Sequence, residues 1–325
     1  MNVDFIADGP DGAARPRDAV VTVGTFDGVH RGHRAVLAEL LRIARERGER
    51  AVAVTFEPHP LRVVRPEHAP RRLTTAEERR ELLLAAGVDE VVTLPFTHEL
   101  ASYSPRRFVE EILIRRVGMA HLVMGYDHGI GRGRAGDADA LREIGAELGF
   151  GVDVVPAIQA EGAPISSTRI RQALAEGDVL AAARGLGRPY TVRGTVVRGA
   201  GRGNELGYPT ANIRVDDPDK LIPLEGIYAV RARGVDRTER DGVLHLGPRP
   251  TFAGEPPSIE LHVFDFAGDL YGRTIEIAFC GRIREVRTFP GPAELIAAMD
   301  EDSARARALF AEGGGACREN ESVLM

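Results

Sequence analysis

Apolar and polar positions alternate in two different ways along this chain, and the pattern changes near residue 187. From residue 19 to about residue 177, short runs of β-branched apolar residues alternate with amphipathic stretches. This alternation predicts βαβ units and a parallel sheet with helices on both faces. The predicted strands are Ala19–Val23, Ala51–Phe56, Glu90–Leu94, His121–Gly125 and Val152–Pro156, and the predicted helices are Arg34–Arg47, Ala76–Ala86, Pro105–Val117 and Ala138–Leu148.

Beyond the apolar stretch Val179–Leu186, Gly and Pro turns separate strand-like runs, with no helical period between them. This predicts a small antiparallel β-barrel or sandwich, closed by a terminal helix at 292–311. We therefore expect an N-terminal domain at 1–186, a second domain at 187–312 and a disordered tail at 313–325. The predicted strands of the second domain are Thr191–Val197, Ile227–Arg233, Gly242–Leu246, Ser258–Phe264 and Thr274–Ile283.

Composition narrows the classes of function. The chain has 325 residues, of which 43% are hydrophobic and 28% charged, as in a folded protein, and its net charge is −6. An acidic balance argues against a nucleic-acid partner, because such proteins need a basic surface against phosphates. The single lysine, Lys220, excludes a Gly-x-x-x-x-Gly-Lys-Ser/Thr phosphate loop. Any ATP chemistry must therefore use glycine backbone, histidine and arginine.

The number of cysteines and the hydropathy of the chain indicate the cellular compartment of the protein. Cys280 and Cys317 are too few for a disulfide framework or a thiolate metal site. The sequence shows no charged-then-apolar leader and no apolar run of 18 residues, so we expect a cytoplasmic protein with no membrane contact. The sequence makes no prediction of oligomeric state.

A glycine- and histidine-rich segment follows the first predicted strand. Gly24, Gly28 and Gly32 let the backbone approach a ligand closely, and the next helix presents its N-terminus to anions. His30 and His33 are three residues apart and can face the same phosphates. Their imidazoles can donate to oxygens where charge develops during attack on a phosphate.

Two other interpretations of this histidine pair stay open. The pair can ligate a metal, although no third ligand stands nearby and zinc sites usually need one. It can also serve only helix capping or packing. Phosphate binding is the interpretation that we favour.

The segment 165–171 predicts a second anion site. Ser167 or Thr168 can cap a helix that begins near Arg169, and Arg171 can bind a phosphate through two N–H groups. An ordinary helix cap with a solvated arginine is the alternative.

A third segment lies in the second domain. Closely spaced glycines, Gly199, Gly201 and Gly203, can form a loop whose N–H groups surround phosphates without a lysine. Thr210 and Asn212 offer a hydroxyl and an amide oxygen, which suit Mg²⁺. A glycine-rich hairpin without a ligand is the alternative.

Taken together, these motifs resemble those of bacterial bifunctional riboflavin kinase/FMN adenylyltransferases, the FAD synthetases. The resemblance extends from residue 19 to residue 311. It includes the Pro-Thr-Ala-Asn run that contains Thr210 and Asn212, which is far more specific than glycine spacing. The segments that carry it are 24–33, 56–60, 125–134, 165–171, 199–212, 246–252 and 265–272.

The resemblance implies a Rossmann-like α/β nucleotidyltransferase domain, followed by a small antiparallel β-barrel kinase domain with a C-terminal helix. The implied enzyme phosphorylates riboflavin to FMN with ATP and then adenylylates FMN to FAD, with Mg²⁺ as cofactor. The implied catalytic residues are Glu260 as the base of the kinase step and His30 with His33 in the second step. The implied ligand residues are Gly24, Phe26, Asp27, Gly32, Ser167, Thr168, Arg171, Gly199, Gly201 and Gly203 for ATP, Asp127 for flavin, and Thr210 with Asn212 for the metal.

The chain departs from its relatives at three places. His128 stands where many relatives have an aromatic residue beside the flavin site, which bears on FMN packing. His245 replaces a common asparagine, and Asn204 replaces a residue that is often basic. Three other functions stay open: an enzyme with one working half, a flavin-binding sensor without turnover, and a nucleotidyltransferase that acts on nucleic acid.

Overall fold

The computed structural model describes residues 15–160, 163–199, 208–247, 258–317. The chain divides into two compact units, Met1–Ser167 and Thr168–Met325. This division falls before the domain boundary that the sequence suggests, after Leu186. The reason is that α7 (Ser167–Ala175) and α8 (Val179–Leu186) belong with the second unit: α8 packs on its barrel, and the Leu174 carbonyl accepts from the Leu224 N–H. Each unit is described by itself below.

The first unit is built on a parallel sheet, as the alternating pattern predicts. Its strand order is β3-β2-β1-β4-β5, and every neighbouring pair is parallel. The five strands match the predicted ones within two residues at each end. They are β1 (Ala19–Val23), β2 (Arg50–Glu57), β3 (Glu90–Pro95), β4 (Met119–Gly125) and β5 (Gly151–Val155).

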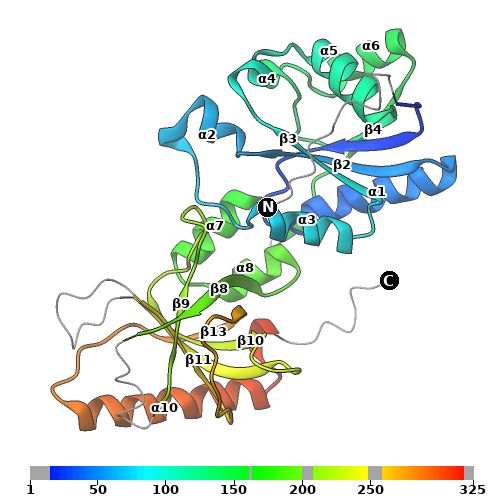
Figure 1. The fold of residues 1–325 in the computed structure, drawn as a ribbon. Helices are drawn as coiled ribbons and strands as arrows, with labels where there is room; N and C mark the ends of the chain where they lie inside the picture. The colour runs from blue at the N-terminus through cyan, green and yellow to red at the C-terminus, as the bar shows by residue number, and fades with distance from the viewer. Residues whose placement is uncertain (1–14, 161–162, 200–207, 248–257, 318–325) are drawn as a thin grey trace. The chain divides into compact units, whose positions relative to one another are not determined.

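Helices cover both faces of this sheet (Figure 1). On one face α1 (Arg31–Arg47) and α3 (Ala76–Ala85) bury Leu37, Leu40 and Leu83 against the strands. On the other face a π-helix, η3 (Val109–Val117), and α6 (Ala138–Leu148) form a second core. Shorter elements complete the unit: α2 (Pro60–Val64), η2 (Pro66–His68), α4 (His98–Ser102), α5 (Pro105–Phe108), η4 (Arg132–Arg134), β6 (Gln159–Ala160) and β7 (Ala163–Pro164).

The strand order of the sheet reverses between β1 and β4. From β1 the chain moves outward to β2 and β3, and β4 then returns to the other side of β1. In open α/β sheets, ligands bind outside the carboxyl ends of the strands at such a reversal. The loops that follow β1 and β4 are therefore the ones that the fold places at a binding crevice.

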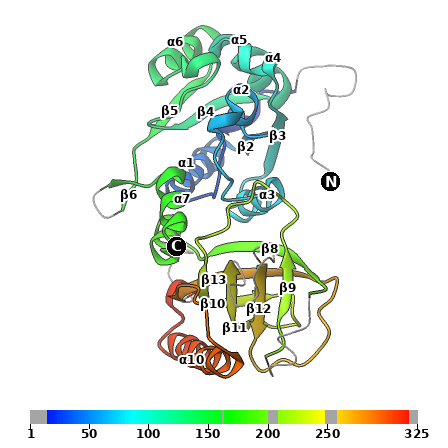
Figure 2. The same cartoon turned by 90° about the vertical axis from the view of Figure 1, so that its left-hand side faces the viewer.

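The second unit contains a closed antiparallel barrel, with strand order β10-β11-β12-β9-β8-β13 (Figure 2). Five of its strands correspond to the predicted runs. The sixth, β9 (Ala211–Arg214), is too short to show a period of its own. The other five are β8 (Tyr190–Val197), β10 (Gly226–Arg233), β11 (Arg240–Gly247), β12 (Ser258–Val263) and β13 (Thr274–Arg284).

The C-terminal helix packs against this barrel. α10 (Pro292–Ala311) has the predicted bounds and buries Ala306 against Ala229 and Phe264. An ion pair joins the two elements, since the Arg284 guanidinium on β13 binds both carboxylate oxygens of the buried Asp302 at 2.7 and 2.8 Å.

A disulfide joins Cys280 on β13 to Cys317, which lies in the short 3₁₀ helix η5 (Gly315–Cys317). No partner was predicted for either cysteine. Residues 313–317, which the sequence places in a disordered tail, have defined positions in the structure, and the rest of that predicted tail lies outside the described residues.

Candidate active sites

The loop after β1 is held in an unusual backbone conformation. Phe26 and Val29 have φ angles of 47° and 38°, a region that residues with a side chain seldom adopt. Both side chains are nevertheless buried, at 3% and 0% exposure. Surrounding contacts must therefore fix the loop, because backbone strain of this kind persists only where the fold imposes it.

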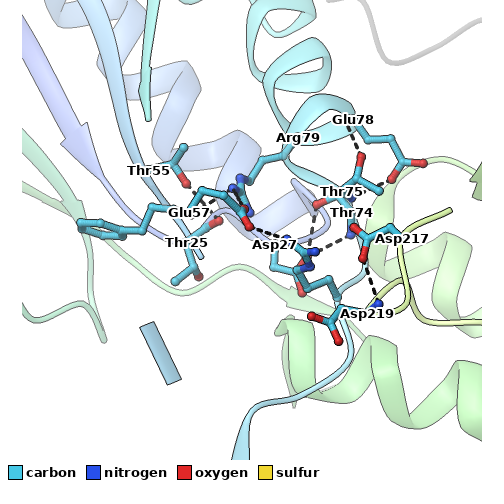
Figure 3. A network of polar contacts seen from close by, with 12 residues as sticks. Thr25, Asp27, Thr55, Glu57, Thr74, Thr75, Glu78, Arg79, Asp217 and Asp219 are labelled. Carbon is cyan, nitrogen blue, oxygen red and sulfur yellow. Dashed lines mark hydrogen bonds and ion pairs between the residues drawn. The ribbon is translucent and has the colours of Figure 1, made fainter. Parts of the chain in front are cut away.

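Asp27 supplies those contacts (Figure 3). Its carboxylate accepts from the backbone N–H groups of Leu73 and Thr74, each at 3.0 Å, and from the Thr74 hydroxyl at 3.2 Å. The Thr74 hydroxyl oxygen also accepts from the Gly28 N–H at 3.1 Å. Asp27 is only 1% exposed. The sequence assigned Asp27 to ATP binding, and the structure gives it a clear positioning role within the loop.

The start of α3 supports the same region. The side chain and backbone of Thr75 exchange hydrogen bonds with those of Glu78 in a capping box. Arg79, one residue on, is 2% exposed and binds the Glu57 carboxylate and the Phe56 carbonyl, each at 3.0 Å (Figure 3). These contacts connect the end of β2 with the segment that holds Asp27.

His30 and His33 meet at the N-terminus of α1. His30 is the N-cap, and its Nδ1 accepts from the His33 backbone N–H at 3.3 Å, so its proton lies on Nε2. The two rings stack with centroids 3.6 Å apart. Burial lowers the pKa of His33 well below its usual value, and His30 and His128 lower it further. His33 is therefore a neutral imidazole at the start of a helix, where anions are favoured.

The segment before α7 closes over this helix start. A side chain at Gly32 would contact His30 and would lie 3.6 Å from the Ile165 carbonyl. The Ser167 hydroxyl donates to the Asp27 carbonyl at 2.9 Å. The first unit thus brings Ile165 and Ser167 to the loop after β1, as the phosphate-binding interpretation requires.

One detail of this segment differs from the sequence prediction. α7 begins at Ser167 rather than near Arg169, so Ser167 and Thr168 lie in its first turn and do not cap it. Ser167 uses its hydroxyl on Asp27 instead. Thr168 is exposed, and Arg171 lies one turn along α7 in the second unit.

The loop after β4 forms the other side of the reversal point. Asp127, the predicted flavin ligand, has an exposed side chain, and its carbonyl accepts from the Arg134 guanidinium. His128 follows it and is half-buried. Burial lowers the pKa of His128 to about 4; Arg134 lowers it too, and Asp127 opposes them.

In the barrel, the predicted kinase residues meet on adjacent strands. Asn212 on β9 stands opposite Glu260 on β12 in the sheet register. The Glu260 carboxylate accepts from the Ser258 hydroxyl at 2.8 Å and from the Thr210 hydroxyl at 3.4 Å. The backbone at Gly199 lies so close to the Asn212 amide that a Cβ there would be 2.0 Å from Nδ2. The other two predicted loop glycines, Gly201 and Gly203, lie outside the described residues.

His262, which is not among the predicted site residues, contacts the segment that leads to Thr210. Its Nδ1 lies 2.9 Å from the Pro209 carbonyl, the residue before Thr210, and its ring packs 5.2 Å from that of Tyr208. The Tyr208 hydroxyl also binds Asp300 on α10. His262 lies two residues after Glu260, so strand alternation puts both side chains on one face, and this spacing is the signal in the sequence that could have identified it.

The donor atoms near Glu260 determine which metal fits. Among the described residues, no group of three or more His, Cys, Asp or Glu side chains could hold a metal. The hydroxyl of Thr210 and the amide of Asn212 are hard oxygen donors, which fit a magnesium ion shared with phosphates rather than an all-protein cage. No helix in the described part of the chain is both long and apolar enough to cross a membrane.

Two family models match this chain, one in its N-terminal half and one in its C-terminal half. The FAD synthetase family model matches residues 13–169, and the riboflavin kinase family model matches residues 186–310. The chain is 41% identical to the bifunctional riboflavin kinase/FMN adenylyltransferase of Pseudomonas fluorescens, over 91% of this chain and 94% of that protein. The chain belongs to the bifunctional riboflavin kinase/FMN adenylyltransferase family.

Other members of this family are similar at lower identity. The Escherichia coli K12 protein of the same description is 37% identical over 90% of this chain and 92% of its own length. Among solved structures, a Streptococcus pneumoniae protein described as a macrolide-efflux protein superposes with a TM-score of 0.82, at 32% identity, over 91% of this chain and 95% of that one. The two-part fold thus recurs in a protein that carries a different description.

Proposed function

We propose that this chain makes FAD in two ATP-dependent steps. The barrel domain phosphorylates riboflavin to FMN, and the parallel-sheet domain transfers an adenylyl group from ATP to FMN and releases pyrophosphate. We assign the steps to residues 187–312 and 1–186, and we place the enzyme in the cytoplasm because both steps consume ATP. The observation that carries the proposal is the arrangement of Ser258, Thr210 and Asn212 around Glu260, within the part matched by the riboflavin kinase family.

In the kinase step, Glu260 is the base. Ser258 holds one of its carboxylate oxygens, which orients the group for the terminal ribityl hydroxyl of riboflavin. As that hydroxyl oxygen attacks the γ-phosphorus of ATP, its proton passes to Glu260 and ADP leaves.

The oxygen donors beside Glu260 suit a metal ion for the same step. Thr210 and Asn212 would hold Mg²⁺, and the backbone of Gly199 packs directly against the Asn212 amide. The ion, when bound, neutralises charge on the transferring phosphate and the leaving group.

In the second step, a phosphate oxygen of FMN attacks the α-phosphorus of ATP, and the bond to pyrophosphate breaks. His30 and His33 donate hydrogen bonds to the phosphate oxygens whose charge increases. We assign Gly24, Phe26 and Gly32 to ATP binding through the backbone, with Ser167, Thr168 and Arg171 as phosphate contacts and Asp127 as a flavin contact. Two features support these assignments: the N-terminus of α1, where anions bind favourably, and the loop before it, which Ser167 contacts at the Asp27 carbonyl.

A matched pair of variants tests this division of labour. Glu260→Gln should reduce riboflavin phosphorylation about 100-fold or more, because the amide cannot accept the proton, and should leave FMN adenylylation unchanged. His30→Asn keeps a good helix cap but removes the imidazole donor. It should reduce FMN adenylylation about 100-fold and leave riboflavin phosphorylation unchanged.

Each variant is assayed separately with riboflavin and with FMN, and the products are separated by chromatography. Full FMN formation by Glu260→Gln would remove Glu260 from the mechanism. Loss of both activities in either single variant would contradict the division into two sites.

A further inference from the structure

His128 lies near the strand-order reversal of the sheet, where open α/β folds bind their ligands. It follows β4, which neighbours β1 where the strand order of the sheet reverses. Its backbone N–H donates to the Gly125 carbonyl at 3.1 Å, so it lies in the first turn after the strand. A Cβ on Gly125 would lie 3.7 Å from Val36 on α1, one turn beyond His33. The end of β4 therefore packs beside α1, the helix that follows the loop after β1.

Several hydrogen bonds hold the loop around His128 in place. Ile130 and Gly136 exchange backbone hydrogen bonds of 3.0 and 2.9 Å, which close the loop on itself. Arg132 donates its N–H to the Tyr103 carbonyl at 2.8 Å, and Arg134 binds the Asp127 carbonyl. These contacts hold the backbone that presents the His128 ring.

Two ring nitrogens at this reversal point are shielded from water and have no hydrogen-bond partner among the described residues. They are Nδ1 of His33 and Nε2 of His128. The two imidazoles also lie within electrostatic range, because His128 contributes to the lowered pKa of His33. A buried polar atom without a hydrogen-bond partner destabilises the folded protein, so such atoms in native proteins usually bind a ligand or an ordered water.

We propose that His128 is a substrate-binding residue of the adenylyltransferase site, where its Nε2 binds a phosphate oxygen alongside His33. The inference rests on the proposed function and adds a third imidazole to its phosphate-binding set. The phosphate belongs either to FMN, which attacks, or to ATP, which is attacked. A neutral imidazole at this position donates one hydrogen bond without placing a fixed positive charge in the site.

The alternative partners fit less well. A metal ion would need a third ligand, and no such cluster exists among the described residues. Protein acceptors are excluded because none lies within hydrogen-bond distance in the described structure. An aromatic ring, common in relatives at this position, could pack beside flavin but could not make this bond.

Two substitutions at this position test the inference. His128→Phe restores the ring type of relatives, so it should fold, but it cannot bond to phosphate. It should raise the KM for either FMN or ATP about tenfold, equivalent to about 1.4 kcal/mol, with kcat changed less. His128→Gln keeps an amide donor and should recover most of the loss. His121→Gln is the matched control: His121 lies on β4, the strand that precedes His128, and its ring is bonded to Asp153, so the change should leave both constants unchanged.

Separate KM measurements for FMN and for ATP identify which substrate supplies the phosphate. A rise confined to the KM for FMN assigns Nε2 to the attacking phosphate, and a rise confined to ATP assigns it to the nucleotide. Calorimetry of His128→Phe with FMN alone and with pyrophosphate alone should show the same weakening. Unchanged KM values and binding in His128→Phe, in a preparation whose wild type adenylylates FMN, would overturn the inference.

Failure of the proposed function would look different. The wild type itself would then form no FAD from FMN. Weaker pyrophosphate or FMN binding by His128→Phe would still support the phosphate contact, and equal binding would still overturn it.

Discussion

Among single residues, Asp27 shows how the first site is held open. A buried carboxylate normally needs several donors, and here the 73–74 segment provides three. The loop that they hold contains two residues with positive φ, and it leads directly to His30. The geometry of the histidine pair therefore depends on a residue that need not touch the nucleotide.

Removing this carboxylate should damage only the first unit. Asp27→Ala leaves two buried N–H groups without their acceptor and should cost about 3 kcal/mol of unfolding free energy in that unit. FMN adenylylation should fall more than tenfold, and riboflavin phosphorylation should stay the same. Asp89→Ala is the control, since the exposed Asp89 also accepts one backbone N–H, from Ala51, at the opposite end of the sheet. Denaturant melts and product assays measure both effects, and equal adenylylation by Asp27→Ala and wild type would contradict this role.

The sequence predicted the residue types of the sites better than their contacts. Glu260, Thr210 and Asn212 come together as expected because they lie on two strands whose register aligns them. The partners of Asp27 could not be predicted, since the 73–74 segment follows a loop with no periodic pattern. Ser167 was misplaced as a cap because its hydroxyl bonds a distant carbonyl, which local capping rules do not anticipate.

Among the elements, long periodic segments were predicted well and short ones were not. The strands of the parallel sheet and the helices α6 and α10 agree with the hydrophobic pattern because their buried faces repeat over several turns or strand positions. β9 has four residues, and its place in the barrel comes from its pairing with β8 and β12. The predicted helix Pro105–Val117 is instead a turn of α-helix, α5, followed by the π-helix η3, a difference that periodicity does not show.

The disulfide between Cys280 and Cys317 is the connection between elements whose effect on stability is most easily tested. It ties η5 to β13 across 37 residues that include α10. The Arg231 guanidinium also donates to the Cys317 carbonyl, so the segment has a second attachment to the barrel. Because the cysteines lie far apart in sequence and only two exist, cysteine counting could not reveal the pair.

Breaking this cross-link should destabilise the barrel unit. Cys317→Ser should lower its unfolding free energy by about 2–4 kcal/mol, chiefly by freeing the unfolded chain. The thiol reductant dithiothreitol should lower the stability of the wild type by a similar amount and should not affect the variant. Thermal melts with and without reductant measure this. Two alkylatable thiols in the unreduced wild type, found by mass spectrometry after denaturation, would show that the bond does not form in solution.

At the scale of the whole molecule, one chain combines two unrelated architectures, and each carries out one step of the proposed route. A parallel sheet provides crevices at strand ends, which suits a nucleotide and a second phosphate substrate. A closed barrel lines up groups on neighbouring strands, which suits a base and a metal beside one hydroxyl. The product of the barrel step is the substrate of the sheet step. A chain with one working half, or a sensor without turnover, would retain the folds and lack this succession.

The most direct test is a chromatographic time course of the purified full-length protein with riboflavin, ATP and Mg²⁺. We expect FMN to appear first and then to be converted to FAD, with ADP formed in the first step and pyrophosphate in the second. Omission of Mg²⁺ should stop FMN formation. Riboflavin bound but unconverted over the same period, or FMN that accumulates and never becomes FAD, would contradict the claim that one chain carries out both steps.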